Sequence, residues 1–172
     1  MPPELTFRCA ECGEIHDLSE LSLGFDAPLQ WVGLTDGERS RSQKSDDQCI
    51  IESAEGRGFY LRGTLDIPVR ETDTQFCWGL WVSLSEASFI EVQENWENPA
   101  RVSMGPYFGW LCNLIPGYPD TALLKTRVHN RPVGMRPSIE LGPTEHPLAI
   151  HQRRGIDREE LFEILTIAMH SN

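Results

Sequence analysis

Two neighbouring segments of the chain alternate in hydrophobicity, and this pattern restricts the fold more than any other feature. Residues 58–69 read GFYLRGTLDIPV, with apolar side chains at most odd positions. Residues 75–85 read QFCWGLWVSLS, with a large apolar side chain at every second position from Phe76 to Leu84. A period of two is typical of a strand with one buried face. The polar stretch RETDT between the segments predicts that they pair as an antiparallel hairpin.

Four further strands are predicted from short apolar runs. They cover CIIES (49–53), PYFGWLCNLI (106–115, as a buried strand), ALLKTRV (122–128) and RPSIEL (136–141). Strands thus occur in runs rather than alternating with helices. The sequence therefore predicts an α+β fold, with a mainly antiparallel sheet, helices packed on one face and an N-terminal Cys-x-x-Cys knuckle.

Three helices are predicted from capping residues and apolar stripes. Ser85 is suited to cap a helix near 86–96, and Thr144 a short helix further on. Asp157 and Glu160 have the spacing of a capping box at the start of the last helix.

The chain has the length of one ordinary domain, and neither a repeat nor a linker divides it. We expect a single domain over 1–172, with a Cys/His knuckle at 7–18. Mainly strands, with one helix near 86–96, are expected at 49–142, and two helices at 144–170.

Composition restricts the setting and the partners. The formal net charge is −11, which disfavours binding to nucleic acid. The N-terminus lacks the features of a signal peptide, and no apolar run approaches the roughly 20 residues that span a bilayer. Five irregularly spaced cysteines argue against a disulfide framework. We therefore expect a cytoplasmic protein without a membrane partner, whose oligomeric state the sequence leaves open.

Charge is unevenly distributed along the chain. Residues 71–100 contain no Lys or Arg but six carboxylates: Glu71, Asp73, Glu86, Glu91, Glu94 and Glu97. Residues 121–139 contain no acid but four cations: Lys125, Arg127, Arg131 and Arg136. The favoured interpretation is that the two stretches neutralise each other across a sheet. The alternative is an acidic docking surface for a basic partner.

The opening FRCAECGEIHDL, residues 7–18, has half the ligands of a zinc site. Cys9 and Cys12 form a Cys-x-x-Cys-Gly turn, and zinc requires four ligands in a structural site. His16 is the expected third ligand and Cys49 the expected fourth. Weaker candidates are Cys77, Cys112 and His146. A metal-free turn and a redox pair are the alternatives, and neighbouring carboxylates disfavour the redox pair because they raise thiol pKa values.

Two features suggest binding or catalysis away from this stretch. Trp81 lies on the strand face opposite the main apolar stripe, beside Tyr60 and Arg62 of the paired strand, which is the composition of an interaction surface. The alternative is that the knuckle or a helix covers this face. His146 precedes a proline at a predicted helix start, where hydrogen bonding to nearby backbone is commoner than a chemical or binding role.

Several motifs together resemble a bacterial family known as domain of unknown function 2199. They are FxCxxCGxxH, the cysteine before IIE, WGLWVSLSE, YFGWLCNLIPGYPDT and EHPLAI, spread over roughly residues 7–160. The resemblance implies a cytoplasmic bacterial setting and no known reaction.

The favoured function is a non-catalytic protein-binding module, with zinc as a structural cofactor of the knuckle. No phosphate-binding loop, nucleophile elbow or zinc-protease motif occurs in the sequence. The alternative is a thiol- or metal-dependent enzyme that uses Cys9, Cys12 or Cys112 with His16 or His146.

Overall fold

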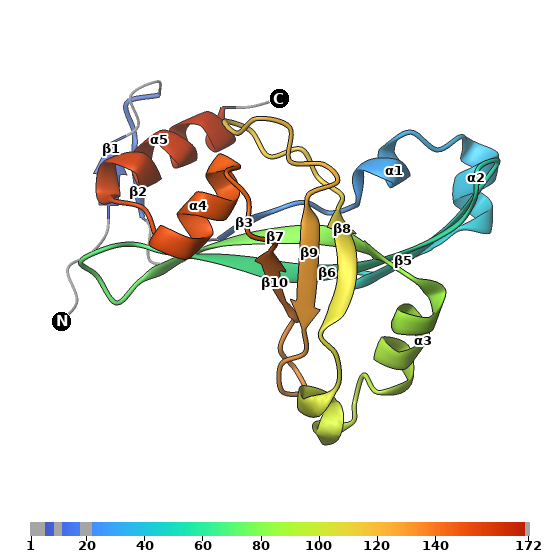
Figure 1. Cartoon of the computed structure of the whole chain (residues 1–172). Helices are drawn as coiled ribbons and strands as arrows, with labels where there is room; N and C mark the ends of the chain where they lie inside the picture. The colour runs from blue at the N-terminus through green and yellow to red at the C-terminus, as the bar shows by residue number, and fades with distance from the viewer. Residues whose placement is uncertain (1–5, 9–11, 18–21, 171–172) are drawn as a thin grey trace.

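A long antiparallel hairpin forms the centre of the molecule. The computed structural model describes residues 6–8, 12–17 and 22–170. Strand β6 (Gly56–Pro68) pairs with β7 (Gln75–Leu84) from Phe59↔Leu84 to Pro68↔Gln75, which confirms the predicted hairpin. Figure 1 shows these two strands running through most of the length of the molecule.

Three shorter strands close this hairpin into a barrel. β8 (Tyr107–Leu111) pairs antiparallel with β7, β9 (Lys125–His129) with β8, and β10 (Ser138–Leu141) with β9. β10 then returns to β6, to which it is parallel, at the pair Ser138↔Thr64. The ring β6–β7–β8–β9–β10 is therefore a closed five-stranded barrel.

Three further strands extend the sheet beyond the barrel. β5 (Gln48–Ser53) pairs with the first half of β6, and β4 (Gln43–Lys44) pairs with β5. β3 (Ser22–Gly24) runs parallel to β7 on its other edge. A separate pair, β1 (Thr6–Arg8) and β2 (Ile15–Asp17), precedes them.

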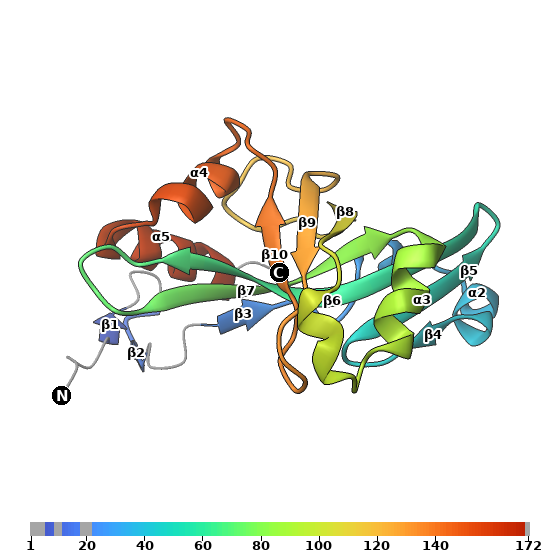
Figure 2. The same ribbon diagram turned by 60° about the horizontal axis from the view of Figure 1, so that its bottom comes forward.

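The helices are short and lie at different ends of the molecule (Figures 1 and 2). They are α1 (Leu29–Val32), α2 (Asp36–Arg41), α3 (Glu86–Glu94), the 3-10 helix η1 (Pro99–Ser103), α4 (Pro147–Arg154) and α5 (Arg158–Met169). Ser85 caps α3, and the Asp157–Glu160 capping box begins α5, as predicted. His146, not Thr144, caps α4.

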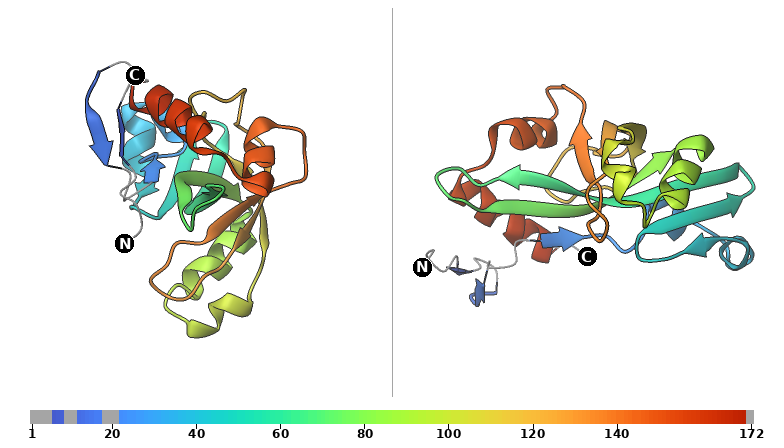
Figure 3. Two further views of the ribbon diagram at one scale, coloured as in Figure 1. Left: turned by 90° about the vertical axis from the view of Figure 1, so that its left-hand side faces the viewer. Right: turned by 90° about the horizontal axis from the view of Figure 1, so that it is seen from below.

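The predicted fold class is wrong. The strands do not form an open sheet with helices on one face, because β10 pairs with β6 and closes the ring. Gly63 permits this closure, since a Cβ atom there would lie 2.8 Å from the carbonyl oxygen of Pro137. The helices instead cover separate parts of the sheet, as the views in Figure 3 also show.

The described residues form two hydrophobic clusters on opposite faces of the hairpin. The larger one fills the barrel and includes Leu61, Leu65, Trp78 and Leu80. The smaller one lies on the outer face and consists of Cys49, Ile51, Tyr60, Trp81 and Cys112, packed against Phe25, Trp31 and Leu34. The outer face of the hairpin is thus also a core. No described helix combines the length and apolar character that crossing a bilayer requires.

Candidate functional site

The predicted zinc ligands are only partly within the described residues. Cys9 lies outside them, Cys12 is exposed, and His16 belongs to β2, in register with Phe7. Cys49 belongs to β5, which lies at the opposite end of the molecule from β1 and β2 in Figures 1 and 2. Within residues 6–8, 12–17 and 22–170, no three His, Cys, Asp or Glu side chains group as metal ligands. The structure therefore does not bring Cys49 to the knuckle, and zinc there stays a prediction.

Three cysteines further along the chain are held in environments that suppress ionisation. Burial raises the pKa of the Cys49 thiol to about 12. Burial, and then the charge of Asp66, raise the pKa of Cys77 to about 11. The pKa of the Cys112 thiol is also raised by burial. Because the thiolate is the reactive form, none of these three is arranged as a nucleophile.

His146 is engaged at both ring nitrogens. Its Nδ1 accepts the backbone N–H of Leu148 at 3.1 Å, which caps α4. Its Nε2 lies 3.2 Å from the carbonyl oxygen of Pro119 and 3.1 Å from that of Asp120. Five residues further along, the Nδ1 atom of His151 lies 2.7 Å from the hydroxyl of Tyr118. Both histidines thus attach α4 to the same PGYPD loop, which is a structural arrangement.

Trp81 lies in the smaller core rather than on the surface. Its side chain is 0% exposed, and its indole Nε1–H donates to the carbonyl oxygen of Phe25 at 2.9 Å. The guanidinium of Arg62 and the ammonium of Lys44 lie 5.9 and 6.0 Å from the ring centroid. Tyr60 is also buried. The segment from β3 through β4 covers this face, so Trp81 has no surface to offer a partner.

Two other aromatic residues are exposed instead. Phe108 and Trp110 point outward from β8 and are 54% and 38% exposed. Their rings meet edge to face with the centroids 5.1 Å apart. The strand predicted at 106–115 is present as β8, but it alternates between buried and exposed positions, so it is buried on one face only. An exposed aromatic pair of this kind is typical of a protein–protein contact.

Leu123 extends this apolar surface through a strained backbone. Its N–H donates to the carbonyl oxygen of Leu111 at 2.7 Å, while the N–H of Leu111 donates to Leu124 at 2.9 Å. Two residues therefore oppose one, as in a β-bulge. Leu123 has φ +65° and is 64% exposed. A bulky residue in this region is a backbone outlier, and such strain concentrates at functional sites. We call Phe108, Trp110 and Leu123 the aromatic patch.

Two cations on β9 border the aromatic patch. Arg127 is directly opposite Phe108, and Lys125 is directly opposite Trp110. Neither forms an ion pair with a described residue. A hollow of about 380 Å³ lies between the two aromatic residues and the start of α3, on the side away from β9. It is lined by Ser83, Ser85 and Ser88 as well as by Phe108 and Trp110.

The charged stretches of the sequence do not neutralise each other in the way that the favoured interpretation expects. Arg131 pairs with Asp66 at 2.6 Å, and Arg136 pairs with Asp47 at 2.7 Å. Of the six carboxylates in 71–100, only Glu86 forms an ion pair among the described residues, with Arg57 at 3.9 Å. No cation of 121–139 pairs with any of them.

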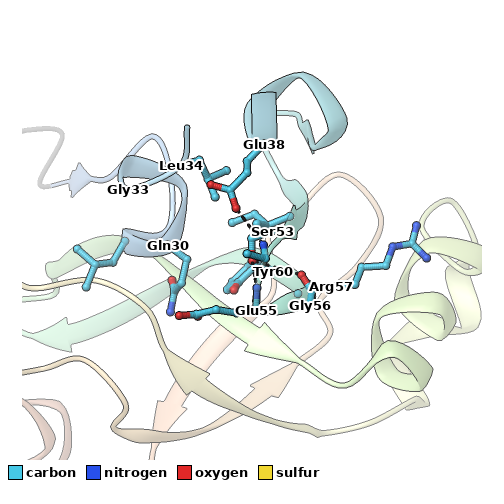
Figure 4. A pocket seen from close by; sticks show the side chains of 13 residues that line it. Gln30, Gly33, Leu34, Glu38, Ser53, Glu55, Gly56, Arg57 and Tyr60 are labelled. Carbon is cyan, nitrogen blue, oxygen red and sulfur yellow. Dashed lines mark hydrogen bonds between the residues drawn. The ribbon is translucent and has the colours of Figure 1, made fainter. Parts of the chain in front are cut away.

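The hollow between the α1–α2 segment and the β5–β6 turn has a volume of about 460 Å³ (Figure 4). Glu38 of α2 lines this hollow. Its carboxylate accepts hydrogen bonds from the backbone N–H groups of Thr35 at 3.1 Å and Ala54 at 3.0 Å. These backbone bonds lower the pKa of the Glu38 carboxyl. The carboxylate therefore caps α2 and joins it to the turn, rather than facing a ligand.

A larger hollow, of about 550 Å³, lies between β6 and the loop at 131–136. Three arginines line it, and each is engaged within the protein. Arg131 and Arg136 have the carboxylate partners given above, and the guanidinium of Arg101 donates only to backbone carbonyl groups. Glu38 and these three arginines are thus engaged within the protein, whereas the side chains of the aromatic patch are exposed.

The sequence contained one usable signal for this surface. Residues 125–129, KTRVH, alternate between exposed and buried positions, which marks an outward face on β9. The strand paired with β9 must present its own outward face beside Lys125 and Arg127, and that face carries Phe108 and Trp110.

Comparison with known proteins places the chain in a family. No curated protein and no solved structure gives a significant match. Residues 8–156 match the model of the family described as an uncharacterised protein conserved in bacteria, DUF2199. Since this match covers most of the chain, the protein belongs to that bacterial family.

Proposed function

We propose that this chain is a small cytoplasmic, non-catalytic protein-binding module and that the aromatic patch is its binding surface. The observation that carries the proposal is the exposed Phe108–Trp110 pair. Trp and Tyr, with Arg, supply most of the binding energy at protein interfaces, and an exposed aromatic pair gains from burial. Lys125 and Arg127 would form the polar rim that surrounds such a centre.

The backbone at Leu123 supports the same proposal. A leucine with positive φ costs roughly 1–2 kcal/mol relative to glycine at that position. The side chain gains little from this strain inside the chain itself, because it is mostly exposed. Burial of the leucine against a partner would offset the cost.

The thiol-enzyme alternative predicts at least one fast-reacting cysteine, and we expect none among Cys49, Cys77 and Cys112. Raising the pKa from 9.0 to about 11, as at Cys77, lowers the thiolate fraction at pH 7 roughly 100-fold. Timed iodoacetamide labelling followed by peptide mass spectrometry should show all three reacting far more slowly than a free cysteine. Because Cys77 stays protonated below its folded pKa, its labelling should rise about tenfold per pH unit through the alkaline range.

The same experiment tests the predicted zinc knuckle. Zinc-bound thiolates are protected, so Cys9 and Cys12 should label slowly until a chelator is added. Labelling of these two that does not change with a chelator would contradict zinc binding. Labelling of Cys49, Cys77 or Cys112 at or above the rate of a free cysteine would revive the enzyme alternative.

Removal of the Trp110 side chain should weaken partner binding without unfolding the protein. We expect that Trp110→Ala reduces capture of a stoichiometric protein partner at least tenfold in affinity purification from the native host, because a central aromatic anchor is worth about 2 kcal/mol or more. Ile15→Ala is the control, since Ile15 is also an exposed apolar residue but belongs to β2, far from the patch in Figures 1 and 2.

A second variant separates binding from folding. Leu123→Gly removes a patch side chain and also relieves the positive-φ strain, so its thermal stability should equal or exceed that of the wild type while capture weakens. Equal capture by wild type, Trp110→Ala and Leu123→Gly would exclude the aromatic patch as the binding surface. Co-purification of a small metabolite in place of a protein would argue against the binding-module function itself.

A further inference from the structure

We infer that the hollow between the α1–α2 segment and the β5–β6 turn is a second binding site, which takes a small organic amine in its ammonium form. The inference goes beyond the proposed function, because none of the residues of the aromatic patch lines this hollow. It rests on a buried hydroxyl group without a partner and on the charges that surround it.

The hydroxyl of Tyr60 is a polar group that the fold leaves unsatisfied. Tyr60 lines the hollow and is 8% exposed, and no described residue forms a hydrogen bond with its hydroxyl. Buried polar groups are normally hydrogen-bonded, and a ligand that supplies the missing partner relieves the cost of leaving one unpaired. Burial raises the pKa of Tyr60 to about 12, so the hydroxyl stays protonated at neutral pH and can both donate and accept.

Gly58 makes room for this hydroxyl on β6. Residues 58 and 60 lie on the same face of the strand, and a Cβ atom at Gly58 would lie 2.6 Å from the Tyr60 oxygen. The phenol ring therefore leans back along β6, toward the β5–β6 turn. In Figure 4, Tyr60 and Glu55 lie on the turn side of the hollow, and Gln30 and Leu34 lie on the α1 side.

The charges around the hollow favour a cationic ligand. Two carboxylates line it, those of Glu38 and Glu55. Backbone N–H groups lower the pKa of Glu38, which keeps it negatively charged. Glu55 is exposed and forms no ion pair with a described residue. After burial, its charge is among those that raise the pKa of Tyr60, so the carboxylate lies within electrostatic range of the hydroxyl.

The cation beside the hollow is turned away from it, which disfavours an anionic ligand. Among the described lining residues this cation is Arg57, which pairs with Glu52 at 3.1 Å and with Glu86 at 3.9 Å. Figure 4 shows its side chain extending away from α1. No three metal-ligating side chains group anywhere in the described part of the chain, so an organic ammonium fits this hollow better than a metal ion.

The remaining lining accommodates a short apolar body. Leu29, Leu34 and Ile51 line the hollow together with the phenol ring, and its volume of about 460 Å³ is in the range of small-ligand sites. An ammonium group beside the Tyr60 hydroxyl donates to its oxygen and lies in the field of the two carboxylates. Phenethylamine combines such a group with an apolar ring and is the probe for this site.

Titration of isotope-labelled protein with three matched probes, followed by NMR, tests the inference. Phenethylamine, phenethyl alcohol and phenylacetate share one ring and differ in charge. We expect phenethylamine to bind in the millimolar range usual for so small a ligand, with saturable shifts of the Gly33, Ala54 and Gly56 amides. The alcohol should bind about threefold more weakly, because it loses the attraction of the carboxylates. Phenylacetate should cause no saturable shifts at these amides.

Two substitutions separate the two polar contacts. Tyr60→Phe should weaken phenethylamine about tenfold, because a hydrogen bond from a charged donor is lost. Its thermal stability should equal or exceed that of the wild type, since the hydroxyl has no partner in the described chain. Glu55→Gln should weaken phenethylamine about threefold and narrow its preference over the alcohol. Glu71→Gln is the matched control and should bind like the wild type, because it removes the same charge from an exposed position at the other end of β6.

Several results would overturn the inference. One is the absence of saturable shifts around the hollow with phenethylamine, and another is unchanged affinity in both Tyr60→Phe and Glu55→Gln. Equal binding of all three probes would overturn the preference for an amine. A loss of thermal stability in Tyr60→Phe would show that the hydroxyl is satisfied within the chain and would remove the basis for a ligand. All of these results are independent of the capture experiment with Trp110→Ala, which tests the proposed function.

Discussion

Replacing Trp81 by alanine is expected to lower the free energy of unfolding by about 3–5 kcal/mol, a large share of the stability of a single domain. The indole is completely buried in the smaller core, against Cys49, Tyr60 and Cys112. Its removal leaves a cavity in the apolar layer between the hairpin and the segment from β3 through β4, and it leaves the carbonyl oxygen of Phe25 without its donor.

Trp110→Ala is the matched control for this prediction. It removes the same side chain from an exposed position of the neighbouring strand, so its cost should stay below about 1 kcal/mol. Trp81→Phe should fall between the two, at about 1–2 kcal/mol, because it keeps most of the apolar volume but loses the bond to Phe25. Urea denaturation followed by circular dichroism measures all three, and equal costs for Trp81→Ala and Trp110→Ala would contradict the assigned burial.

The elements of the fold were predictable where the signal is local. The hairpin β6–β7 follows from a period of two over adjacent segments, and the caps at Ser85 and Asp157 follow from side chains that bond the first helical turn. The barrel was not predicted, because its closure depends on one pairing between segments far apart, at Ser138↔Thr64. A local trace of that pairing is Gly63, a glycine inside a strand.

The site was harder to predict because alternation assigns a side chain to a face but does not say what covers that face. Trp81 and Trp110 both lie outside the barrel, yet the β3–β4 segment buries the first and leaves the second exposed. One neglected signal was the capping box formed by Thr35 and Glu38, which predicts a helix in the covering segment. A helix predicted there would have favoured the alternative in which a helix covers the strand face that carries Trp81.

The partners of the charged side chains were equally hard to predict from the sequence. The sequence shows that acidic and basic stretches are separate, but ion pairing depends on which segments the barrel brings together. Arg131 and Arg136 find carboxylates on β6 and before β5, while Lys125 and Arg127 face outward from β9 beside the aromatic patch. Cations from one stretch thus have opposite roles, since two stabilise the fold and two are available to a partner.

Arg101 is the one arginine whose role is invisible in the sequence, and we expect Arg101→Met to lower the free energy of unfolding by about 3–5 kcal/mol. Its side chain is 4% exposed, although Arg is seldom buried without a carboxylate. The guanidinium donates to the carbonyl oxygens of Trp96 at 2.8 Å, Arg131 at 2.7 Å, Pro132 at 2.9 Å and Met135 at 2.7 Å. Methionine keeps the apolar stem but leaves four acceptors without their donor.

The geometry of the donors, rather than the charge alone, should decide the effect. Arg101→Lys keeps the positive charge, but a single ammonium cannot reproduce the planar array of donors of a guanidinium. That array bonds the carbonyl group of Trp96, before η1, and those of Arg131 and Pro132 in the loop at 131–135. We therefore expect Arg101→Lys to lose about 2 kcal/mol or more, and the exposed control Arg127→Met less than about 0.5 kcal/mol. Hydrogen exchange should rise first in the loop at 131–135, because three of the four carbonyl groups that Arg101 bonds belong to this loop. Full stability of Arg101→Lys would show that the buried charge, and not the array of hydrogen bonds, holds this loop in place.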